Sequence, residues 1–430
     1  MMTNTDYLHP RDQILETMDR IYRHRMTTTS GGNVSIRDGS GDVWITPARV
    51  DKGALRRDDI VQVRPEGTQS GLHRASSELP FHQAIYAARP DLSAIVHAHP
   101  AALVAFSMTR TVPETRLFPQ SWSVCGEVGL ATYALPGSAQ LGANIAKEFA
   151  AGFNTVVLEN HGVVVGGANL TEAFQRFEAL EFAAQTAIRS TTLGSARPLS
   201  AARLEAVGRG RKELPETDPP APTSEEKELR RTLCEFVRRG CQQRLLISTE
   251  GSFSVRLGES SFLITPAHRD RYRLSPEDLV RIDSGRRATG QTPSRATACH
   301  EAIYRKHPTV KAICFAHPIH ATAFSVTGVP FASRTIPESY IVLRDVQRIP
   351  FGQPYDDVDA VASAVSPRQP SAILENDGVL IVGTSILDAF DRLEVLEATA
   401  EALIFSGRIG AAAPMSDSVI DELRAHFLPE

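Results

Sequence analysis

The sequence predicts an α/β sandwich around a largely antiparallel sheet, and it predicts that this fold is present twice in tandem. The first observation is an internal repeat, in which GGNVSIRDGSGDVWITPA at 31–48 corresponds to EGSFSVRLGESSFLITPA at 250–267. Further on, LENHGVVVGGANLTEAFQRFEALE at 158–181 corresponds to LENDGVLIVGTSILDAFDRLEVLE at 374–397. The separation of matching segments hardly changes along the chain, which indicates a duplicated domain. The second observation is that each copy has short strands joined by hairpins and followed by helices.

The elements follow from the spacing of apolar residues in the first copy. Residues 12–22 have apolar side chains at helical spacing, which predicts a helix. The β-type segments 33–37 and 43–46 are separated by the sequence DGSG, which is typical of a hairpin connection. The other predicted elements of this copy are helix 79–88, strand 94–99, the strand pair 155–158 and 163–166, and helix 171–190.

The stretch between the copies is rich in proline, charge and small residues, which is typical of a linker. We therefore expect a first domain at 1–195, a linker at 196–224 and a second domain at 225–430. A short helix is predicted inside the linker, around 199–207. At about 150 residues per domain, the length of the chain agrees with two or three domains.

The composition excludes several classes of function. The net charge is −4 and no basic stripe is present, which argues against a nucleic-acid partner. No run of about 18 apolar residues would span a membrane, and the first residues lack the apolar core of a signal peptide. Five scattered cysteines without a CxxC pair predict neither a disulfide framework nor a cysteine zinc site. We expect a cytoplasmic protein that acts on a small-molecule substrate.

Two histidines two positions apart are the first candidates for chemistry. His97 and His99 lie on a predicted strand, so their side chains point to the same face. His161 lies in a predicted turn next to Gly162, where a glycine permits close approach of another group. Three neutral histidines would leave one coordination position of a zinc ion open for substrate. The alternative is that these are surface and turn histidines without a ligand.

Glu78 follows Ser76 and Ser77 at the start of a predicted helix. One interpretation is helix capping, in which a serine and an acid stabilise the first turn. The other is functional, because free N–H groups and two hydroxyls form an anion pocket beside a carboxylate that could act as general base. Gly32 and Asn33 lie in a glycine-rich turn that enters a strand, which is either a hairpin turn or a backbone nest for an anion.

The second copy helps to decide between these interpretations. Where the first copy has Glu78, His97, His161 and Asn33, the second has, in that order, Ala296, Phe315, Asp377 and Ser252. The partner of His99 survives as His317, and core positions such as His82 persist as His300. Chemical residues that are lost together on a retained scaffold indicate a site in the first copy that the second no longer needs. We therefore predict no metal in the second copy.

At these residues the chain resembles the class II aldolase and adducin family. The motifs that carry the resemblance are Gly32-Asn33, Thr46-Pro47, Ser76-Ser77-Glu78, His97-Ala98-His99-Pro100 and Asn160-His161-Gly162. The resemblance covers nearly all of the chain outside the linker. It implies a three-layer α/β/α sandwich of the nine-stranded type in each copy. It also implies a zinc site formed by His97, His99 and His161, Glu78 as acid or base, and a substrate phosphate near Asn33, Thr46, Ser76 and Ser77.

Two departures from the family pattern affect the expected substrate and assembly. Relatives often have glycine in a TPSG or TPTG segment, whereas Arg49 stands there in this chain. Arg49 would bind a phosphate or, equally well, a planar carboxylate, which favours a decarboxylase. The resemblance implies four-fold rings in which a neighbour supplies a tyrosine, so we expect a homodimer that mimics such a ring. In the corresponding region the chain has Trp122 and Tyr340, so Tyr340 is either a proton donor or a buried interface residue.

The sequence therefore predicts a metal-dependent lyase that cleaves a C–C bond of a small hydroxy-keto or sugar (phosphate) substrate through an enediolate. The expected cofactor is Zn²⁺, with Fe²⁺ or Mn²⁺ as alternatives. Decarboxylation and epimerisation on the same site remain open, because the fold does not choose between them. The resemblance also leaves open an iron oxygenase that uses the same histidines. From another class, a non-catalytic scaffold like the adducin heads remains an alternative, although it would not need three converging imidazoles.

Overall fold

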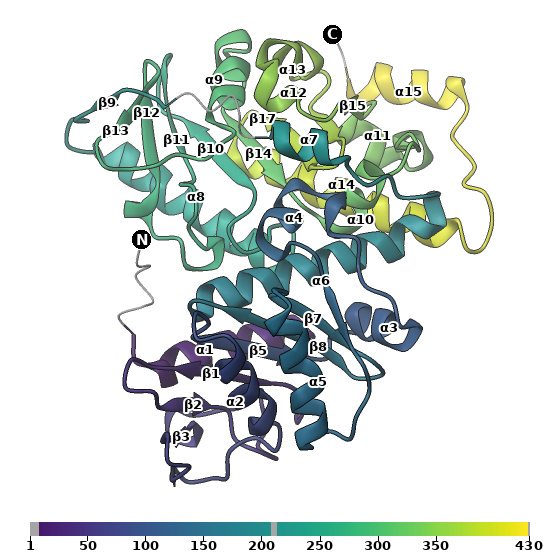
Figure 1. The fold of residues 1–430 in the computed structure, drawn as a ribbon. Coiled ribbons are helices and arrows are strands. Elements are labelled where there is room, and N and C mark those ends of the chain that lie inside the picture. The colour runs from purple at the N-terminus through teal and green to yellow at the C-terminus, as the bar shows by residue number, and fades with distance from the viewer. Residues whose placement is uncertain (1–7, 208–212, 429–430) are drawn as a thin grey trace. The chain divides into compact units, whose positions relative to one another are not determined.

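The computed structural model describes residues 8–207 and 213–428, which form two compact units (Figure 1). The first unit comprises Met1–Thr115 and Gln120–Gln185, and the second comprises Arg116–Pro119 and Thr186–Glu430. Each unit contains one sheet that is covered by helices. The predicted α/β fold and its tandem duplication are therefore confirmed.

The first unit is built on an eight-stranded sheet with the order β4-β3-β2-β1-β5-β8-β7-β6. Its strands are β1 (Asn33–Arg37), β2 (Val43–Ile45), β3 (Val61–Val63), β4 (Gln69–Ser70), β5 (Ala94–Ala98), β6 (Gly129–Ala131), β7 (Thr155–Leu158) and β8 (Gly162–Gly167). Neighbouring strands are antiparallel except for β6 and β7, which are parallel. The expectation of nine strands is wrong for this sheet, which has eight among the described residues.

Helices cover both faces of this sheet and bury its alternating apolar residues. They are α1 (Pro10–Arg23), α2 (Leu79–Ala88), α3 (Ala101–Thr109), α4 (Pro119–Cys125), α5 (Ala139–Ala150) and α6 (Leu170–Leu193), with short 3₁₀ turns η2 (Arg57–Asp59) and η3 (Thr115–Leu117). Helices α2 and α5 pack together in one core layer, in which Phe81 and Phe149 are almost fully buried. Helices α1 and α3 contact β1 and β8 respectively.

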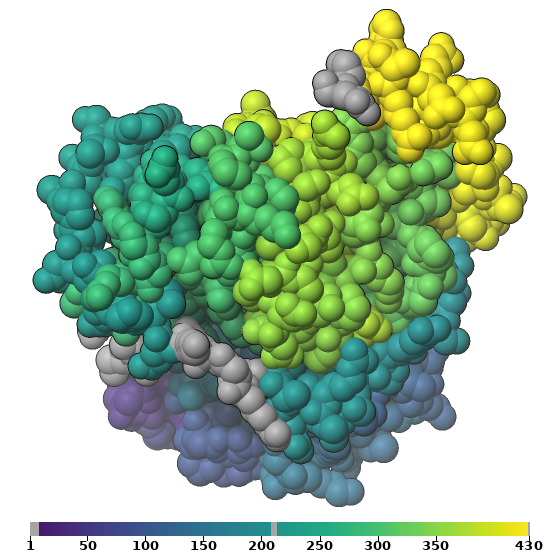
Figure 2. Space-filling model, turned by 90° about the horizontal axis from the view of Figure 1, so that it is seen from above, coloured from purple at the N-terminus to yellow at the C-terminus, as the bar shows by residue number. Residues whose placement is uncertain are grey.

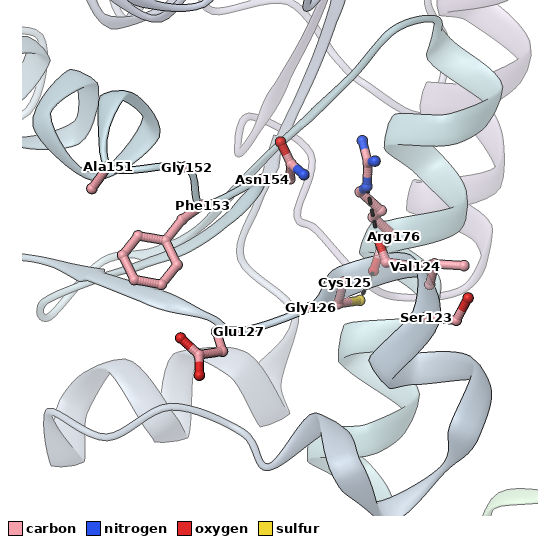
Figure 3. Close-up of a pocket in the computed structure, with 10 residues that line it drawn as sticks. All are labelled: Ser123, Val124, Cys125, Gly126, Glu127, Ala151, Gly152, Phe153, Asn154 and Arg176. Carbon is pink, nitrogen blue, oxygen red and sulfur yellow. Dashed lines mark hydrogen bonds between the residues drawn. The ribbon is translucent and has the colours of Figure 1, made fainter. Parts of the chain in front are cut away.

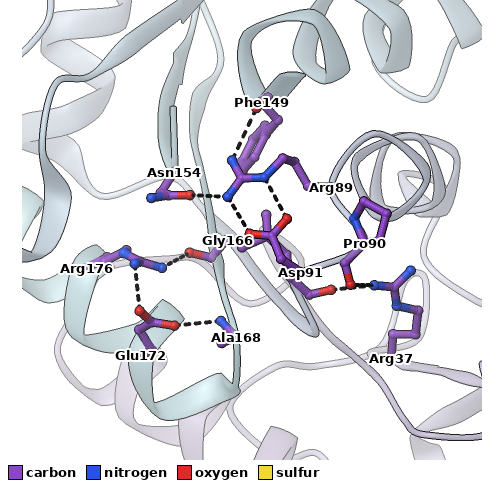
Figure 4. A network of polar contacts seen from close by, with 11 residues as sticks. Arg37, Arg89, Pro90, Asp91, Phe149, Asn154, Gly166, Ala168, Glu172 and Arg176 are labelled. Atoms are coloured by element: carbon purple, nitrogen blue, oxygen red, sulfur yellow. Dashed lines mark hydrogen bonds and ion pairs between the residues drawn. The ribbon is translucent and has the colours of Figure 1, made fainter. Parts of the chain in front are cut away.

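Figure 4 shows the contacts that fix the C-terminal end of α2. Arg89 follows the helix, pairs with Asp91 at 2.6 Å, and donates to the side chain of Asn154 and the carbonyl of Phe149. Arg37 at the end of β1 donates to backbone carbonyls that follow the same helix. Helix α2 is thereby held at its far end, while Glu78 lies at its start.

The second unit contains a nine-stranded sheet with the order β15-β16-β17-β14-β10-β11-β12-β13-β9. Its strands are β9 (Glu216–Thr217), β10 (Ser252–Arg256), β11 (Ser261–Ile264), β12 (Val280–Asp283), β13 (Arg286–Ala288), β14 (Ala312–Ala316), β15 (Gln347–Ile349), β16 (Ser371–Leu374) and β17 (Gly378–Gly383). Strand β9 belongs to the predicted linker but pairs in parallel with β13. The stretch between the copies is thus partly a structural element of the second sheet.

The helices of the second unit repeat those of the first, with α12 and α13 in the place of α5, and add one helix at each end. They are α7 (Ala201–Ala206), α8 (Ser224–Gln242), α9 (Thr297–Lys306), α10 (Ile319–Ser325), α11 (Pro337–Leu343), α12 (Gln353–Asp356), α13 (Val358–Ala364), α14 (Ile386–Ser406) and α15 (Asp417–Phe427), with 3₁₀ turns η4 (Arg271–Arg273), η5 (Pro276–Asp278) and η6 (Ser333–Thr335). Helix α7 lies where the short linker helix is predicted. Both units have an equivalent ion pair, Arg20–Glu178 in the first and Arg239–Glu394 in the second, each at 2.8 Å.

A bilayer-spanning helix would need a long, apolar stretch, and none of the helices among the described residues has one.

Candidate active site

Three histidines converge at one end of the first sheet. His97 lies in β5, His99 directly follows this strand, and His161 lies in the turn between β7 and β8. One nitrogen from each of the three imidazoles lies within 4.8 Å of those of the other two. The Nε2 atoms of His97 and His99 are 3.0 Å apart, so these side chains point to the same place, as the strand prediction requires. Across residues 8–207 and 213–428, no other cluster of three or more potential ligands of this kind is present.

The environment favours the neutral, metal-binding form of two of these imidazoles, those of His99 and His161. His97 is fully buried, and its Nδ1 lies 2.9 Å from the carbonyl oxygen of Val163. This contact assigns the proton to Nδ1 and leaves the lone pair of Nε2 directed at the cluster. Burial and the neighbouring His97 lower the pKa of His99 to about 3 and the pKa of His161 to about 4.

The carboxylate of Glu78 lies beside the histidine cluster. Its Oε2 is 3.2 Å from Nε2 of His97, and its Oε1 is 3.4 Å from Nε2 of His161. Burial raises the pKa of this carboxyl, whereas His97 and His161, when protonated, and a hydrogen bond from Asn33 lower the pKa below its usual value. Oε1 is buried, and none of the described residues donates a hydrogen bond to it. Because such an atom is costly to bury, its position fits a site that holds a cation or receives a proton.

A chain of buried hydrogen bonds fixes the orientation of Glu78. The links join Tyr86 Oη to Ser35 Oγ at 2.8 Å, Ser35 Oγ to His82 Nδ1 at 2.7 Å, His82 Nε2 to Asn33 Oδ1 at 2.5 Å, and Asn33 Nδ2 to Glu78 Oε2 at 2.8 Å. The amide of Asn33 must donate to the carboxylate, so its oxygen accepts from His82, and the direction of the other links follows. Burial lowers the pKa of His82 to about 3, which keeps this imidazole neutral.

This hydrogen-bonded chain was not predicted, because its bonds join residues that are distant in sequence. The four-residue spacing of Glu78 and His82 was a local signal, but it does not indicate the partners of His82. Lys52 was not predicted either; it is buried, donates to the carbonyl of Pro47, and has its pKa lowered to about 8 by burial. At the corresponding position of the second domain, the buried Arg271 also donates to backbone carbonyls. A cation in both copies indicates that Lys52 supports the loop rather than the chemistry.

Two glycines allow the strands to approach closely at the site. Gly32 has a φ of +69°, and a Cβ atom there would lie 2.7 Å from the carbonyl oxygen of His97. A Cβ atom on Gly162 would lie 2.6 Å from both the carbonyl oxygen of Ala98 and Cδ2 of His99. Real Cβ atoms do not approach other atoms so closely, so the geometry requires glycine at both positions.

Thr46, predicted to lie near a substrate phosphate, is fully buried in this structure. Its Oγ1 accepts a hydrogen bond from the backbone N–H of Val34 at 3.3 Å. Thr265 makes the same bond with Phe253 in the second domain. This repetition favours a structural role for Thr46, and a contact with substrate stays a prediction.

The two serines before Glu78 differ in their availability. Ser76 is almost fully buried, and its Oγ accepts from the backbone N–H of Glu78 at 3.3 Å. The side chain of Ser77 is exposed. The N-cap position of α2 is Glu78, which makes no side-chain capping bond, so Ser76 supports the turn before the helix and the predicted serine cap is wrong. Ser77 remains accessible to a ligand.

Arg49 adopts an unusual backbone conformation at the position where relatives often have glycine. Its φ is +57°, in the left-handed region that glycine favours, and its side chain is exposed. His268 has the corresponding position in the second domain and a φ of +56°. The geometry of this turn therefore explains why glycine is common here, and Arg49 retains the turn at a cost in backbone energy.

The second domain retains the strand register of the site without its ligands. Ser252 lies opposite Phe315 in the pairing of β10 with β14, just as Asn33 lies opposite His97 in the pairing of β1 with β5. The alignment of the two copies made from sequence is therefore reproduced in space. Within the described residues, no cluster of three or more metal ligands occurs at this place.

The buried hydrogen-bonded chain is also interrupted in the second domain. Tyr304, Ser254 and His300 repeat its first links at 2.8 Å and 2.7 Å. Ser252 is too short to continue the chain as Asn33 does. As far as the structure describes the chain, Nε2 of His300 and Oγ of Ser252 are buried without a hydrogen-bond partner.

Tyr340, the predicted proton donor, lies in α11 and is only 3% exposed. Its hydroxyl accepts a hydrogen bond from Nε of Arg424 at 2.6 Å. Arg424 belongs to α15, the yellow helix that projects at the edge of the second unit (Figure 2). The phenol thus has a structural partner within its own unit, and its catalytic role stays a prediction.

A cavity of about 320 Å³ in the first unit offers no comparable chemistry (Figure 3). Burial raises the pKa of the Cys125 thiol in its wall to about 12, so this thiol is not a nucleophile near neutral pH. Arg176 is tied to the carbonyls of Val124 and Gly166 and to the carboxylate of Glu172. Figure 4 shows the same contacts to Gly166 and Glu172.

A family model described as the class II aldolase and adducin N-terminal domain matches this chain twice, at residues 12–188 and 231–404. The two matches correspond to the two copies and together span most of the sequence. The chain belongs to the class II aldolase and adducin family, as a tandem duplicate.

Named relatives share about one copy with this chain. An L-fuculose phosphate aldolase from Methanococcus maripaludis is 34% identical over 166 residues, which are 38% of this chain and 88% of the relative. A 3-oxo-tetronate 4-phosphate decarboxylase from Pectobacterium atrosepticum is 31% identical over 175 residues, 40% of this chain and 80% of the relative. A solved L-fuculose 1-phosphate aldolase aligns with 28% identity and a TM-score of 0.42, covering 47% of this chain and 95% of that one. These relatives are lyases, and this chain is an enzyme of the class II aldolase type.

Replacing Arg49 by glycine is expected to raise the free energy of unfolding of the first domain by up to about 1 kcal/mol, because glycine adopts the left-handed region without strain. Urea unfolding followed by tryptophan fluorescence measures this, since Trp44 and Trp122 both lie in the first unit. Arg64→Gly is the matched control, because Arg64 is an exposed arginine without a positive φ. It should lower stability by about 0.5–1 kcal/mol. Equal destabilisation by both changes would contradict the interpretation.

Proposed function

We propose that the first domain is a metal-dependent lyase that cleaves a C–C bond of a small phosphorylated hydroxy-keto compound by the aldol reaction, through an enediolate. The observation that carries the proposal is the convergence of His97, His99 and His161 on one point, with the carboxylate of Glu78 held beside it. A non-catalytic scaffold has no need of this arrangement.

The residues fit a divalent cation, and zinc is the expected ion. Three imidazoles with converging nitrogen atoms match the protein ligands of a catalytic zinc site. The buried Oε1 of Glu78, which lacks a hydrogen-bond donor among the described residues, supports a positive group at the same place. When bound, the cation supplies Lewis acidity that stabilises negative charge on a substrate oxygen.

Glu78 is the residue expected to move the proton. Its Oε2 is occupied by the amide of Asn33, whereas Oε1 is directed toward the cluster and remains available. A carboxylate fixed in this way can remove the proton from a substrate hydroxyl or return one to the carbon of the enediolate. The buried chain behind Asn33 keeps the carboxylate in one orientation during both steps.

Two features support a phosphorylated substrate. The relatives named above are an aldolase and a decarboxylase whose names include a phosphate. In this chain, Ser77 is exposed next to the start of α2, and Gly32 lies in the adjacent turn. Hydroxyl and backbone N–H groups of this kind bind phosphate in many proteins.

Decarboxylation is the second candidate, and Arg49 favours it. Its guanidinium is exposed and replaces the bare glycine backbone that sugar-phosphate relatives often have. A guanidinium binds a planar carboxylate in a bidentate manner. Loss of carbon dioxide would generate the same type of carbanion that Glu78 protonates. Assays with sugar phosphates and with hydroxy-keto acids distinguish the two reactions.

Elemental analysis of the purified protein is expected to find about one zinc, iron or manganese ion per chain. His97→Ala should lose this ion, because it removes a buried ligand that no other residue replaces. His317→Ala is the matched control, since His317 is the histidine that survives in the second domain and its loss should leave the metal content unchanged. Two ions per chain, or none after reconstitution, would contradict the proposal.

Glu78→Gln is expected to keep the metal and to lower kcat by about 10²–10⁴-fold, the contribution typical of general acid–base catalysis. Transfer of deuterium from solvent to the product carbon should fall in parallel, because the amide cannot carry the proton. Glu66→Gln, in an exposed loop of the same domain, is the control. Unchanged turnover in the Glu78 variant would remove the assigned role.

Tyr340→Phe separates the two roles open to Tyr340. A proton donor would lose about 10²-fold or more in kcat at unchanged metal content. A buried structural residue would show a lower Tm with unchanged kcat, because only the bond with Arg424 is lost. An unchanged kcat in Tyr340→Phe would contradict the proposal that Tyr340 completes an active site in the expected homodimer.

A further inference from the structure

The second domain contains a recess of about 840 Å³ beside its degenerate site. It lies between the start of α9 and the segment that contains α12, and all of the residues that line it belong to the second unit. Its size is within the usual range for sites that hold small molecules. The loss of the metal ligands has therefore not closed this part of the domain.

Arg295 presents an available cation to this recess. It stands at the position of Ser77 in the first copy, and its side chain is accessible. One guanidinium nitrogen, Nη2, donates to Tyr355 Oη at 2.9 Å, and the group stacks 4.1 Å from the centre of the same ring. No other hydrogen bond joins Arg295 to the described residues, so most of its five N–H donors remain for a ligand.

Neighbouring side chains fix the orientation of Arg295. Tyr355 accepts from Arg295 and donates to Oδ2 of the partly buried Asp377 at 2.8 Å. Oδ1 of Asp377 lies 3.5 Å from Nε2 of His317. Because the hydroxyl of Tyr355 is hydrogen-bonded to both Arg295 and Asp377, the guanidinium is oriented before any ligand binds. This orientation reduces the entropy lost on binding.

Among the described residues, the other two arginines that line the recess each have a carboxylate partner. Arg287 pairs with Glu216 at 2.8 Å and donates to two backbone carbonyls. Arg203 lies 3.8 Å from Glu375 and 4.7 Å from the ring of Phe351. Arg295 differs from both because its one hydrogen-bond partner is the neutral hydroxyl of Tyr355.

The rest of the lining determines what else the ligand must carry. Glu213, Glu301 and Asp356 also face the recess, and carboxylates accept hydrogen bonds from hydroxyl groups. Ser294 and Thr297 add hydroxyls next to Arg295, at the start of α9, where Ala296 provides no side-chain cap. A ligand with one oxyanion and several hydroxyls can bind Arg295 through the oxyanion and donate hydrogen bonds from its hydroxyls to the carboxylates. A compact polyanion would be repelled by the carboxylates.

We propose that the second domain binds a hydroxylated small organic anion, a sugar phosphate or a sugar acid, with its oxyanion on Arg295 and without a metal ion. This binding site does not depend on the function proposed for the first domain. The second copy would then be a ligand-binding domain in which two of the three histidine ligands are lost and one oriented guanidinium is gained.

Hydrogen–deuterium exchange of the full-length protein tests this binding, with ribose 5-phosphate, gluconate and neutral ribose as probes. At least one of the two anions should slow exchange in residues 292–301 and 351–358, and ribose should not. The comparison of the two anions identifies the preferred oxyanion. The same protection is expected in His97→Ala, which lacks the first-domain metal site, so failure of this inference and failure of the proposed function can be told apart.

Arg295→Ala should raise the half-saturating concentration by about tenfold, the loss of one charge-assisted hydrogen bond. Arg305→Ala is the matched control, because Arg305 lies in the helix that follows Arg295 and pairs with Asp359 outside the lining. Arg295→Lys retains the charge and should bind better than the alanine variant at an equal Tm, which separates binding from folding. No protection by either anion, equal protection by ribose, or unaltered binding in Arg295→Ala would overturn the proposal.

Discussion

The register of β1, β5 and β8 is the constraint on which the active-site end of the first domain depends. It places Asn33 opposite His97 and brings the carbonyl of Val163 to Nδ1 of His97. A shift of one residue in either pairing would turn His97 to the other face of the sheet. A Cβ atom at Gly32 or Gly162 would lie within 2.7 Å of a backbone carbonyl oxygen of β5. The register therefore leaves no room for a side chain at either position. The positions of the imidazoles are therefore set by the sheet itself.

A second constraint is that polar groups buried beneath the sheet need partners. In the first domain, the line from Tyr86 to Glu78 satisfies each group in turn and ends on a carboxylate. In the second domain, the change from asparagine to serine at 252 leaves His300 with one unsatisfied nitrogen among the described residues. His300 persists because its other nitrogen still binds Ser254 within the core. The same buried histidine thus orients Asn33 and Glu78 in one copy and contributes only to the core in the other.

The sequence was sufficient to predict the elements that carry the site, because strand alternation, helical spacing and turn residues are local signals. Helix 79–88 and strand 155–158 agree with α2 and β7, and the three histidines meet as their strands require. The two-residue strand β9 has too little pattern to be predicted, and its place depends on pairing with β13. The chain through His82 was out of reach for a similar reason, since its bonds join residues that are distant in sequence.

The oriented guanidinium of the second domain makes its divergence difficult to reverse in evolution. Restoring a histidine at Asp377 would remove the carboxylate that Tyr355 contacts and leave an imidazole near a permanent cation. Restoring a histidine at Phe315 alone would bury a polar ring without the asparagine and glutamate that accompany it in the other copy. Each single reversal is unfavourable until the others have occurred, so the two halves of the chain are held in separate roles by epistasis.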